Sequence, residues 1–218
     1  MRMLLRILKW AAILFFGSSV LAVVMLRWVP VWVTPLMVIR TVQADAHGDR
    51  FRGWHHTWVP LDEMSKWMPR AVVASEDGRF YDHHGFDFKE IQNAIDESRR
   101  GKRQRGASTI TQQTAKNVFL WPGHSWVRKG LEAYFTVLIE LFWSKERILE
   151  VYLNSIEMGP DIYGAEAAAT QLFGKPASAL TKRQCALIAV SLPNPLKRDA
   201  ANPTAYMRRR ASTIMRYM

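Results

Sequence analysis

Two carboxylates, Glu76 and Asp77, end an apolar run of the sequence and are followed by Phe80 and a pair of histidines. If that run is a buried helix, a carboxylate at its end is partly desolvated, which raises its pKa and suits it to general-base catalysis. Taken alone, such a cluster is more often a solvated helix end. His83 and His84 also suggest a metal site, but no HExxH motif or matching cysteine and histidine spacing accompanies them. The cluster therefore predicts a candidate base and not a metal centre.

A second group of polar residues follows a basic, glycine-flanked loop at residues 101–106 and opens a predicted helix. Free backbone N–H groups at a helix start bind phosphate, and hydroxyl and ammonium donors reinforce that binding. The alternative is an ordinary polar helix with a Ser or Thr cap. The spacing does not match the phosphate-binding loop of nucleotide-binding proteins. The group includes Gly106, Ser108, Thr109, Gln113, Lys116 and Asn117, and its hydroxyl and ammonium groups are the candidate anion-binding donors.

Two further segments carry charged residues at helical spacing. Arg128 and Glu132 are four residues apart, so an ion pair on one helix face is the default interpretation. The functional alternative is that Arg128 and Lys129 contact a diphosphate while Glu132 holds a metal ion or a substrate hydroxyl. In residues 145–154 we expect the apolar positions to be core and the charges to form an exposed face, with Asn154 ending the helix.

Together these segments closely resemble the glycosyltransferase family 51 domain of peptidoglycan polymerases. That family is marked by four ordered motifs, EDxxFxxHxG, GxSTIxQQ, RKxxE and KxxILxxYLN. This sequence matches them at residues 76–85, 106–113, 128–132 and 145–154. One motif would be a weak signal, whereas four in this order are specific. The resemblance covers the chain from about residue 60 onward and implies a mainly α, lysozyme-like fold.

The resemblance also implies an activity, the transfer of a growing lipid-diphosphate-linked glycan onto the 4-hydroxyl of lipid II. The anomeric configuration inverts, a β-1,4 linkage forms and undecaprenyl diphosphate is released. Glu76 is implied to be the general base and Glu132 to support the leaving diphosphate, with Mg or Mn as a candidate cofactor held by Glu132. No nucleotide cofactor is expected, because the diphosphate already activates the donor. The residues implied to line the diphosphate site are Ser108, Thr109, Gln113, Lys116, Asn117, Arg128 and Lys129, and those implied to shape the first motif of the substrate site are Asp77, Phe80 and His83.

The N-terminus has the pattern of a membrane anchor, with basic residues ahead of an apolar run. We expect a single pass through the bacterial inner membrane, with the N-terminus cytoplasmic and the catalytic domain periplasmic. Pro30 and Pro35 disfavour one continuous long helix beyond the span. A cleaved signal peptide is the alternative, but no small-x-small cleavage pattern follows the run. The expected division is a basic N-terminus (1–9), a transmembrane anchor (10–28), a membrane-proximal linker (29–59) and the glycosyltransferase domain (60–218).

From residue 60 onward the pattern predicts a succession of helices separated by capping and breaking residues. Neither a long alternating strand pattern nor an internal repeat is present, so the predicted fold class is mainly α. Cys185 is the only cysteine and lies in an apolar stretch, which indicates core packing. Helix-capping signals are expected at Asp87 with Glu90, at Ser108 or Thr109, at Ser125, Ser144 and Gly174, at Thr181 with Gln184, and at Asn202 before Pro203.

The net charge of +11 favours an anionic partner, which is nucleic acid, a membrane surface or a phosphorylated substrate. A basic run at residues 99–105 would suit nucleic acid, but the expected topology places the domain away from cytoplasmic nucleic acid. A glycan-cleaving enzyme or a non-catalytic envelope scaffold would also be compatible with a helical domain on a membrane anchor. The expected partners are lipid II, the lipid-linked glycan strand, the membrane, and proteins of cell-wall synthesis or division. The chain contains no SxxK motif, so no transpeptidase activity is expected.

Overall fold

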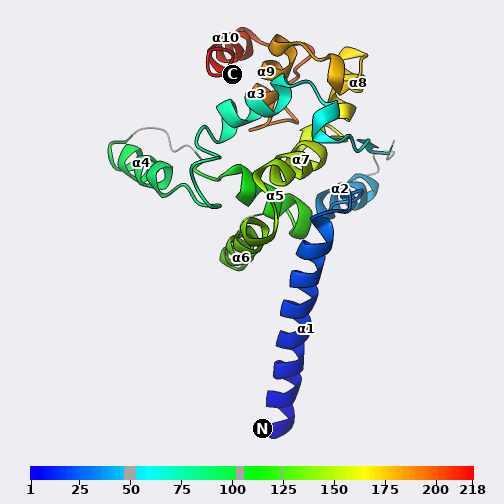
Figure 1. Cartoon of the computed structure of the whole chain (residues 1–218), viewed down its shortest axis with the longest axis vertical. Coiled ribbons are helices and arrows are strands. Elements are labelled where there is room, and N and C mark those ends of the chain that lie inside the picture. The colour runs from blue at the N-terminus through cyan, green and yellow to red at the C-terminus, as the bar shows by residue number, and fades with distance from the viewer. Residues whose placement is uncertain (47–52, 102–105, 124) are drawn as a thin grey trace.

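The computed structural model describes residues 1–46, 53–101, 106–123 and 125–218, and in them the chain is mainly helical, as predicted (Figure 1). The α-helices are α1 (Arg2–Leu26), α2 (Pro35–Ala46), α3 (Trp67–Glu76), α4 (Phe88–Arg99), α5 (Ile110–Phe119), α6 (Trp126–Phe142), α7 (Lys145–Ser155), α8 (Ala165–Phe173), α9 (Lys182–Ser191) and α10 (Ala205–Ile214). The shorter elements are two 3-10 helices, η1 (Leu61–Glu63) and η2 (Ala177–Ala179), and the strands β1 (His55–His56), β2 (Glu157–Gly159) and β3 (Ile162–Tyr163).

The three strands form a small sheet in the order β1-β3-β2. β1 runs parallel to β3 with His55 opposite Ile162, and β2 pairs antiparallel with β3. Strands of two or three residues are too short for an alternating pattern to be seen, so the sequence did not predict them. The sheet joins the segment that precedes α3 to the segment that follows α7.

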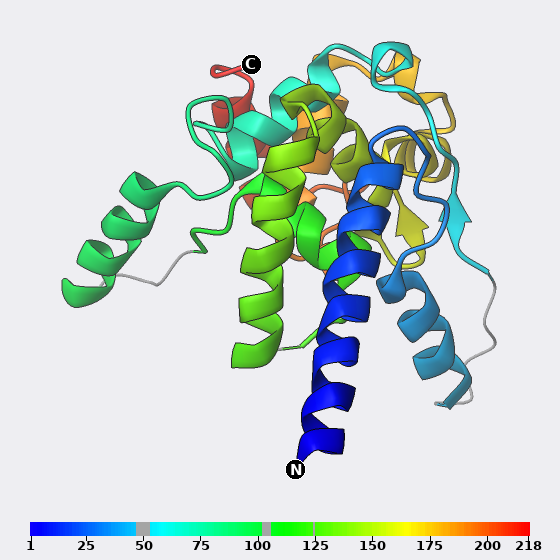
Figure 2. The same ribbon diagram turned by 60° about the horizontal axis from the view of Figure 1, so that its bottom comes forward.

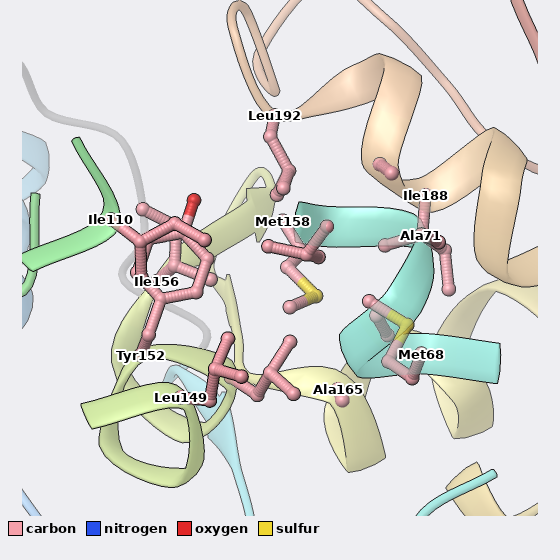
Figure 3. Close-up of a cluster of buried hydrophobic side chains, with 14 of the residues drawn as sticks. Met68, Ala71, Ile110, Leu149, Tyr152, Ile156, Met158, Ala165, Ile188 and Leu192 are labelled. Carbon is pink, nitrogen blue, oxygen red and sulfur yellow. The ribbon is translucent and has the colours of Figure 1, made fainter. Parts of the chain in front are cut away.

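The core lies where α3 packs against α9, α5 packs against α6 and α7, and α10 packs against α9. Figure 3 shows side chains from several of these helices meeting in one apolar cluster. Met68 and Ala71 of α3 and Ile188 of α9 are fully buried there, as are Leu149 and Tyr152 of α7. This packing fixes the end of α3 beside the start of α5, which is where the first two sequence motifs meet.

Most predicted helix starts are confirmed by side chains that accept a hydrogen bond from the first turn. Thr109 and Thr181 each form a capping box, and Ser125, Ser144 and Asp87 each cap a helix. At the other end of α8, Gly174 takes the left-handed conformation of a helix C-cap, with φ of 64°.

The cap predicted at Asn202 is wrong, and the helix end predicted at Asn154 is one residue short. The Asn202 amide instead donates to Asp199, and Thr204 caps α10 by accepting from the N–H of Met207. Helix α7 continues to Ser155. Both errors are small shifts along the chain, since several residues able to cap or end a helix stand close together there.

Helix α1 begins at Arg2, earlier than the predicted span, and has 25 residues, of which the N-terminal part projects from the rest of the molecule (Figure 1). At 1.5 Å per residue it is long enough for a hydrocarbon layer of about 30 Å. Its most apolar stretch has a mean hydropathy of 2.1, and among the described residues no other helix meets the length and composition required to cross a membrane. The helix ends at Leu26, and α2 starts at Pro35 after the capping residue Thr34.

The second half of α1 is attached to the helical domain by polar contacts as well as by packing along α6 (Figure 2). Ser19 and Tyr134 share a hydrogen bond of 2.7 Å between their hydroxyls. The indole N–H of Trp143 donates to the carbonyl of Val23 at 2.8 Å. The Arg147 guanidinium donates to the carbonyl of Leu26. The end of α1 is therefore part of the folded domain and not a detached leader.

Candidate active site

Glu76 is the last residue of α3, and its carboxylate receives two hydrogen bonds. The Ser75 hydroxyl donates to Oε1 at 3.2 Å, and the Gln113 amide donates to Oε2 at 3.3 Å. Burial raises the pKa of Glu76, while the bonds from Gln113 and Ser75 and the charges of Arg210 and Arg198 oppose that rise. The predicted desolvation of a carboxylate at the end of a buried helix is therefore confirmed.

The orientation of the Gln113 amide is set by Tyr152. The Tyr152 hydroxyl donates to Gln113 Oε1 at 3.0 Å, which leaves the amide nitrogen to face Glu76. Burial, with the nearby charges of Glu76 and Asp77, raises the pKa of Tyr152 well above its usual value. Tyr152 therefore stays protonated and keeps donating to Gln113 at all working pH values.

Asp77 joins the end of α3 to the start of α5. Its Oδ2 accepts from the backbone N–H of Ile110 at 3.0 Å, and its Oδ1 lies 2.9 Å from His83 Nε2. Phe80 is fully buried under the Lys145 ammonium, which lies 4.5 Å from the ring centroid. Phe80 packs edge-on against His83, and His83 contacts Asp77, the residue that follows Glu76. The fully buried Phe80 has no surface to offer a substrate, so its predicted place in the substrate site is wrong.

At the start of α5, two of the backbone N–H groups that the sequence suggested for phosphate are already bonded within the protein. The N–H of Ile110 is bonded to Asp77, and the N–H of Gln112 is bonded to the Thr109 hydroxyl at 3.2 Å. Thr109 in turn donates to the carbonyl of Gly85 at 2.6 Å. Gly85 has φ of 84°, and a Cβ there would lie 2.7 Å from Thr136. The start of α5 is therefore joined to the end of α3 through Asp77, and at least two of its N–H groups are not free for phosphate.

Beside this joint lies a cationic cavity of about 460 Å³. Arg128 Nη1 donates to Glu132 Oε2 at 2.7 Å, and Lys129 pairs with the other oxygen of the same carboxylate. Burial lowers the pKa of Lys116, opposed mainly by the charge of Glu132. Four cations against two carboxylates leave the cavity with an excess of positive charge. Its lining residues are Leu36, Arg40, Ser108, Lys116, Asn117, Leu120, Trp121, Pro122, Gly123, Arg128, Lys129, Glu132 and Glu157.

Three residues of this cavity carry a buried donor atom with no hydrogen-bond partner in the described part of the chain. These atoms are Asn117 Nδ2, Arg128 Nε and Arg40 Nε. Buried donors are nearly always paired in folded proteins, so three unpaired ones among the residues of one cavity favour a site that binds a ligand or ordered water. A ligand rich in negatively charged oxygens would satisfy both the donors and the excess charge.

A second cavity, of about 550 Å³, lies around Glu76. Its lining includes Asp77, Gly106, Thr109 and Gln113, and it shares Ser108 with the cationic cavity. The two cavities therefore adjoin at Ser108, as expected for a base that faces an anion-binding site.

Some charged lining residues lie outside the four motifs and were not predicted as site residues, among them Arg40, Glu157 and Arg210. Arg40 and Glu157 line the cationic cavity, and Arg210 of α10 lines the cavity around Glu76. Arg40 falls in the segment expected to be a linker, and Arg210 falls in an arginine run of a type that usually faces solvent. Neither has a local sequence signal, because only the tertiary packing brings each one to the site.

The donor atoms around Glu132 do not favour a metal ion, because both carboxylate oxygens already face a cation, Arg128 or Lys129. Elsewhere in the described residues, Asp77, His83 and Asp87 bring ligand atoms within 4.8 Å of one another. Asp77 and Asp87 are, however, bonded to the N–H of Ile110 and to the guanidinium of Arg79. Neither group offers a set of free ligands, and we assign no chemical step to a metal.

Comparison with known proteins identifies the family of the chain. A family model described as transglycosylase matches residues 45–218. The chain therefore belongs to the transglycosylase family, as the four ordered motifs predicted.

Individual relatives are similar over nearly the whole chain. It is 59% identical over 216 residues to a biosynthetic peptidoglycan transglycosylase of Bacteroides thetaiotaomicron, covering 98% of this chain and 87% of that protein. Proteins of the same name from Bdellovibrio bacteriovorus and Caulobacter vibrioides are each 52% identical, covering 95% and 98% of this chain and 84% and 90% of their own length.

Proposed function

We propose that this enzyme is a peptidoglycan glycosyltransferase that polymerises lipid II into β-1,4-linked glycan strands and releases undecaprenyl diphosphate. The observation that carries the proposal is the contact between two cavities at Ser108, one holding a desolvated carboxylate and the other an excess of cations. The names of the similar proteins support the substrate class.

In the proposed reaction Glu76 takes the proton of the acceptor 4-hydroxyl as that oxygen attacks the anomeric carbon of the donor. The new bond joins the acceptor oxygen to the anomeric carbon, and the bond from that carbon to the diphosphate oxygen breaks with its electron pair. One displacement inverts the configuration. A base with a raised pKa is well matched to this step, since it takes a proton more readily than an ordinary carboxylate does.

The diphosphate gains negative charge as it leaves, and the cationic cavity is suited to stabilise it. Lys116, Arg128 and Lys129 supply positive charge, and Asn117 supplies a buried amide donor. Such groups act most strongly when they are already in place and shielded from water. Because the donor carries its own leaving group, the reaction requires no nucleotide.

Helix α1 is proposed to be a retained anchor in the bacterial inner membrane, with the catalytic domain on the periplasmic side. The bonds from Tyr134, Trp143 and Arg147 to α1 favour retention, because cleavage after α1 would remove their partners. The cations that precede the apolar run favour a cytoplasmic N-terminus. An anchor would keep the domain at the surface where lipid II and the lipid-linked strand reside. Proteins of cell-wall synthesis or division are proposed partners on that surface, and nucleic acid is not.

The proposal is tested by giving the purified full-length protein lipid II in liposomes and separating the products by length. We expect longer glycan strands and one undecaprenyl diphosphate for each linkage formed. Pre-formed strands without lipid II serve as the control and should keep their length. If the protein shortened those strands and never lengthened them, it would be a glycan-cleaving enzyme and the proposal would fail.

A further inference from the structure

Helix α2 brings a cation into the anion site from a segment that carries none of the four motifs. The helix packs against α5 with Met37 fully buried, and Leu36 and Arg40, which are four residues apart, both line the cationic cavity. Val38 and Val42 are exposed on the same helix. Arg40 is therefore held at the cavity by the packing of a whole helix, not by a loose linker.

The guanidinium of Arg40 is only partly satisfied by the protein. Its Nη2 lies 3.4 Å from Glu157 Oε2, near the outer limit of a hydrogen bond, and its Nε is buried with no partner in the described chain. Glu157 is itself buried in the wall of the same cavity. Arginine and carboxylate side chains that serve only to neutralise each other often form two short hydrogen bonds, whereas Arg40 and Glu157 share one long contact.

We propose that Arg40 binds the diphosphate of the lipid-linked donor directly, and that it completes the anion site formed by Lys116, Asn117, Arg128 and Lys129. This inference rests on the proposed function. Arg40, Asn117 and Arg128, which each carry an unpaired buried donor, all line the same cavity. A planar guanidinium can bind phosphate oxygens with two donors at once, which an ammonium cannot do.

The position of α2 also predicts that the Arg40 contact favours diphosphates that carry a lipid chain. The helix follows the anchor α1 after a short break, and its exposed valines are suited to a lipid surface. A donor that carries both a lipid chain and a diphosphate would meet the two parts of its structure on one helix. A water-soluble diphosphate would contact Arg40 but would lack the lipid chain that the exposed valines could meet.

The test measures the affinity of the full-length protein in nanodiscs for undecaprenyl diphosphate, together with the kinetics of lipid II polymerisation. We expect Arg40→Gln to weaken binding by about tenfold or more and to raise KM more than it lowers kcat. Arg40→Lys should give an intermediate loss. Arg27→Gln is the matched control, because Arg27 is an exposed cation at the end of α1 that does not line the cavity.

A double variant separates binding from a purely structural ion pair. The double variant Arg40→Gln with Glu157→Gln also removes the carboxylate that Arg40 pairs with, so that no unpaired charge at Glu157 destabilises the fold. We expect its diphosphate binding to stay weak. Recovery of wild-type binding in the double variant would overturn the inference, and so would equal losses in Arg40→Gln and Arg27→Gln. If the wild type polymerises lipid II and Arg40→Gln binds normally, this inference alone is wrong. If the wild type does not polymerise, the proposed function itself is wrong.

Discussion

Gln113 donates a hydrogen bond from its amide nitrogen to Glu76 Oε2 at 3.3 Å, while its amide oxygen accepts one from the Tyr152 hydroxyl. The same helix presents Lys116 and Asn117, three and four residues further on, to the cationic cavity. Helix α5 therefore spans both halves of the site, so its position sets the distance between base and anion-binding groups.

Gln113→Ala should move the acid limb of the kcat/KM profile to higher pH. The hydrogen bond from Gln113 lowers the pKa of Glu76, so its loss raises that pKa further and leaves less of the base ionised at a given pH. The profile is measured with lipid II between pH 4 and 10. Tyr152→Phe should shift the limb in the same direction but less, because the amide remains and is only freed to rotate. An acid limb that stays unchanged in both variants would show that the ionisation of Glu76 does not control kcat/KM.

Lys116→Arg should extend activity on the alkaline side. Burial lowers the pKa of Lys116, so the wild-type lysine loses its charge, and with it the stabilisation of the leaving diphosphate, at a lower pH than an ordinary lysine. Arginine stays charged throughout this range. The alkaline limb of kcat/KM should therefore move up or disappear, while the rate at neutral pH falls because the guanidinium is larger. An alkaline limb that stays in place would assign that limb to another group.

Glu132→Gln should lower the free energy of unfolding by about 3 kcal/mol, since it leaves the buried Arg128 cation without its counter-charge. Chemical denaturation measures this loss. Asp82→Asn is the control, because its pair with Arg79 is long and exposed and should contribute less than about 1 kcal/mol. If added Mg²⁺ stabilised the wild type but not Glu132→Gln, Glu132 would be a metal ligand and not a structural partner of Arg128.

Phe80→Ala and Ser108→Ala should have opposite signatures. Phe80 is fully buried, so its truncation should cost about 3–5 kcal/mol of stability while the KM of the folded fraction stays the same. Ser108 is exposed between the two cavities, so its loss should leave stability unchanged and raise KM by roughly tenfold. Unfolding curves and lipid II kinetics on the same samples distinguish the two. A KM effect of Phe80→Ala without a stability effect would contradict its placement in the core.

The sequence was sufficient to predict most helices and the residues of the four motifs, because capping side chains and apolar spacing act over a few residues. It could not show that the N–H of Ile110, in the first turn of α5, is occupied, since Asp77 reaches Ile110 only in the folded chain. Nor could it bring Arg40 to the cavity, since α2 meets α5 through tertiary packing. The local pattern predicts which residues can do chemistry, whereas long-range packing decides which of them meet.

Glu76→Gln should abolish the reaction without harming the fold. The folded state favours protonated Glu76, because burial raises the pKa of this residue. The wild type therefore gains stability relative to the glutamine variant as the pH falls through the pKa that Glu76 has in the folded state. At neutral pH the variant should therefore have an equal or higher Tm, because it removes a partly buried charge. Glu146→Gln, an exposed change on α7, is the control and should leave both rate and Tm as in the wild type.

The most direct test is the rate of glycan lengthening by Glu76→Gln, measured with lipid II in liposomes beside its affinity for undecaprenyl diphosphate. We expect the rate to fall by at least about 100-fold while the affinity stays as in the wild type, since the base and the anion site occupy separate cavities. A Glu76→Gln protein that lengthened strands at the wild-type rate would contradict the account.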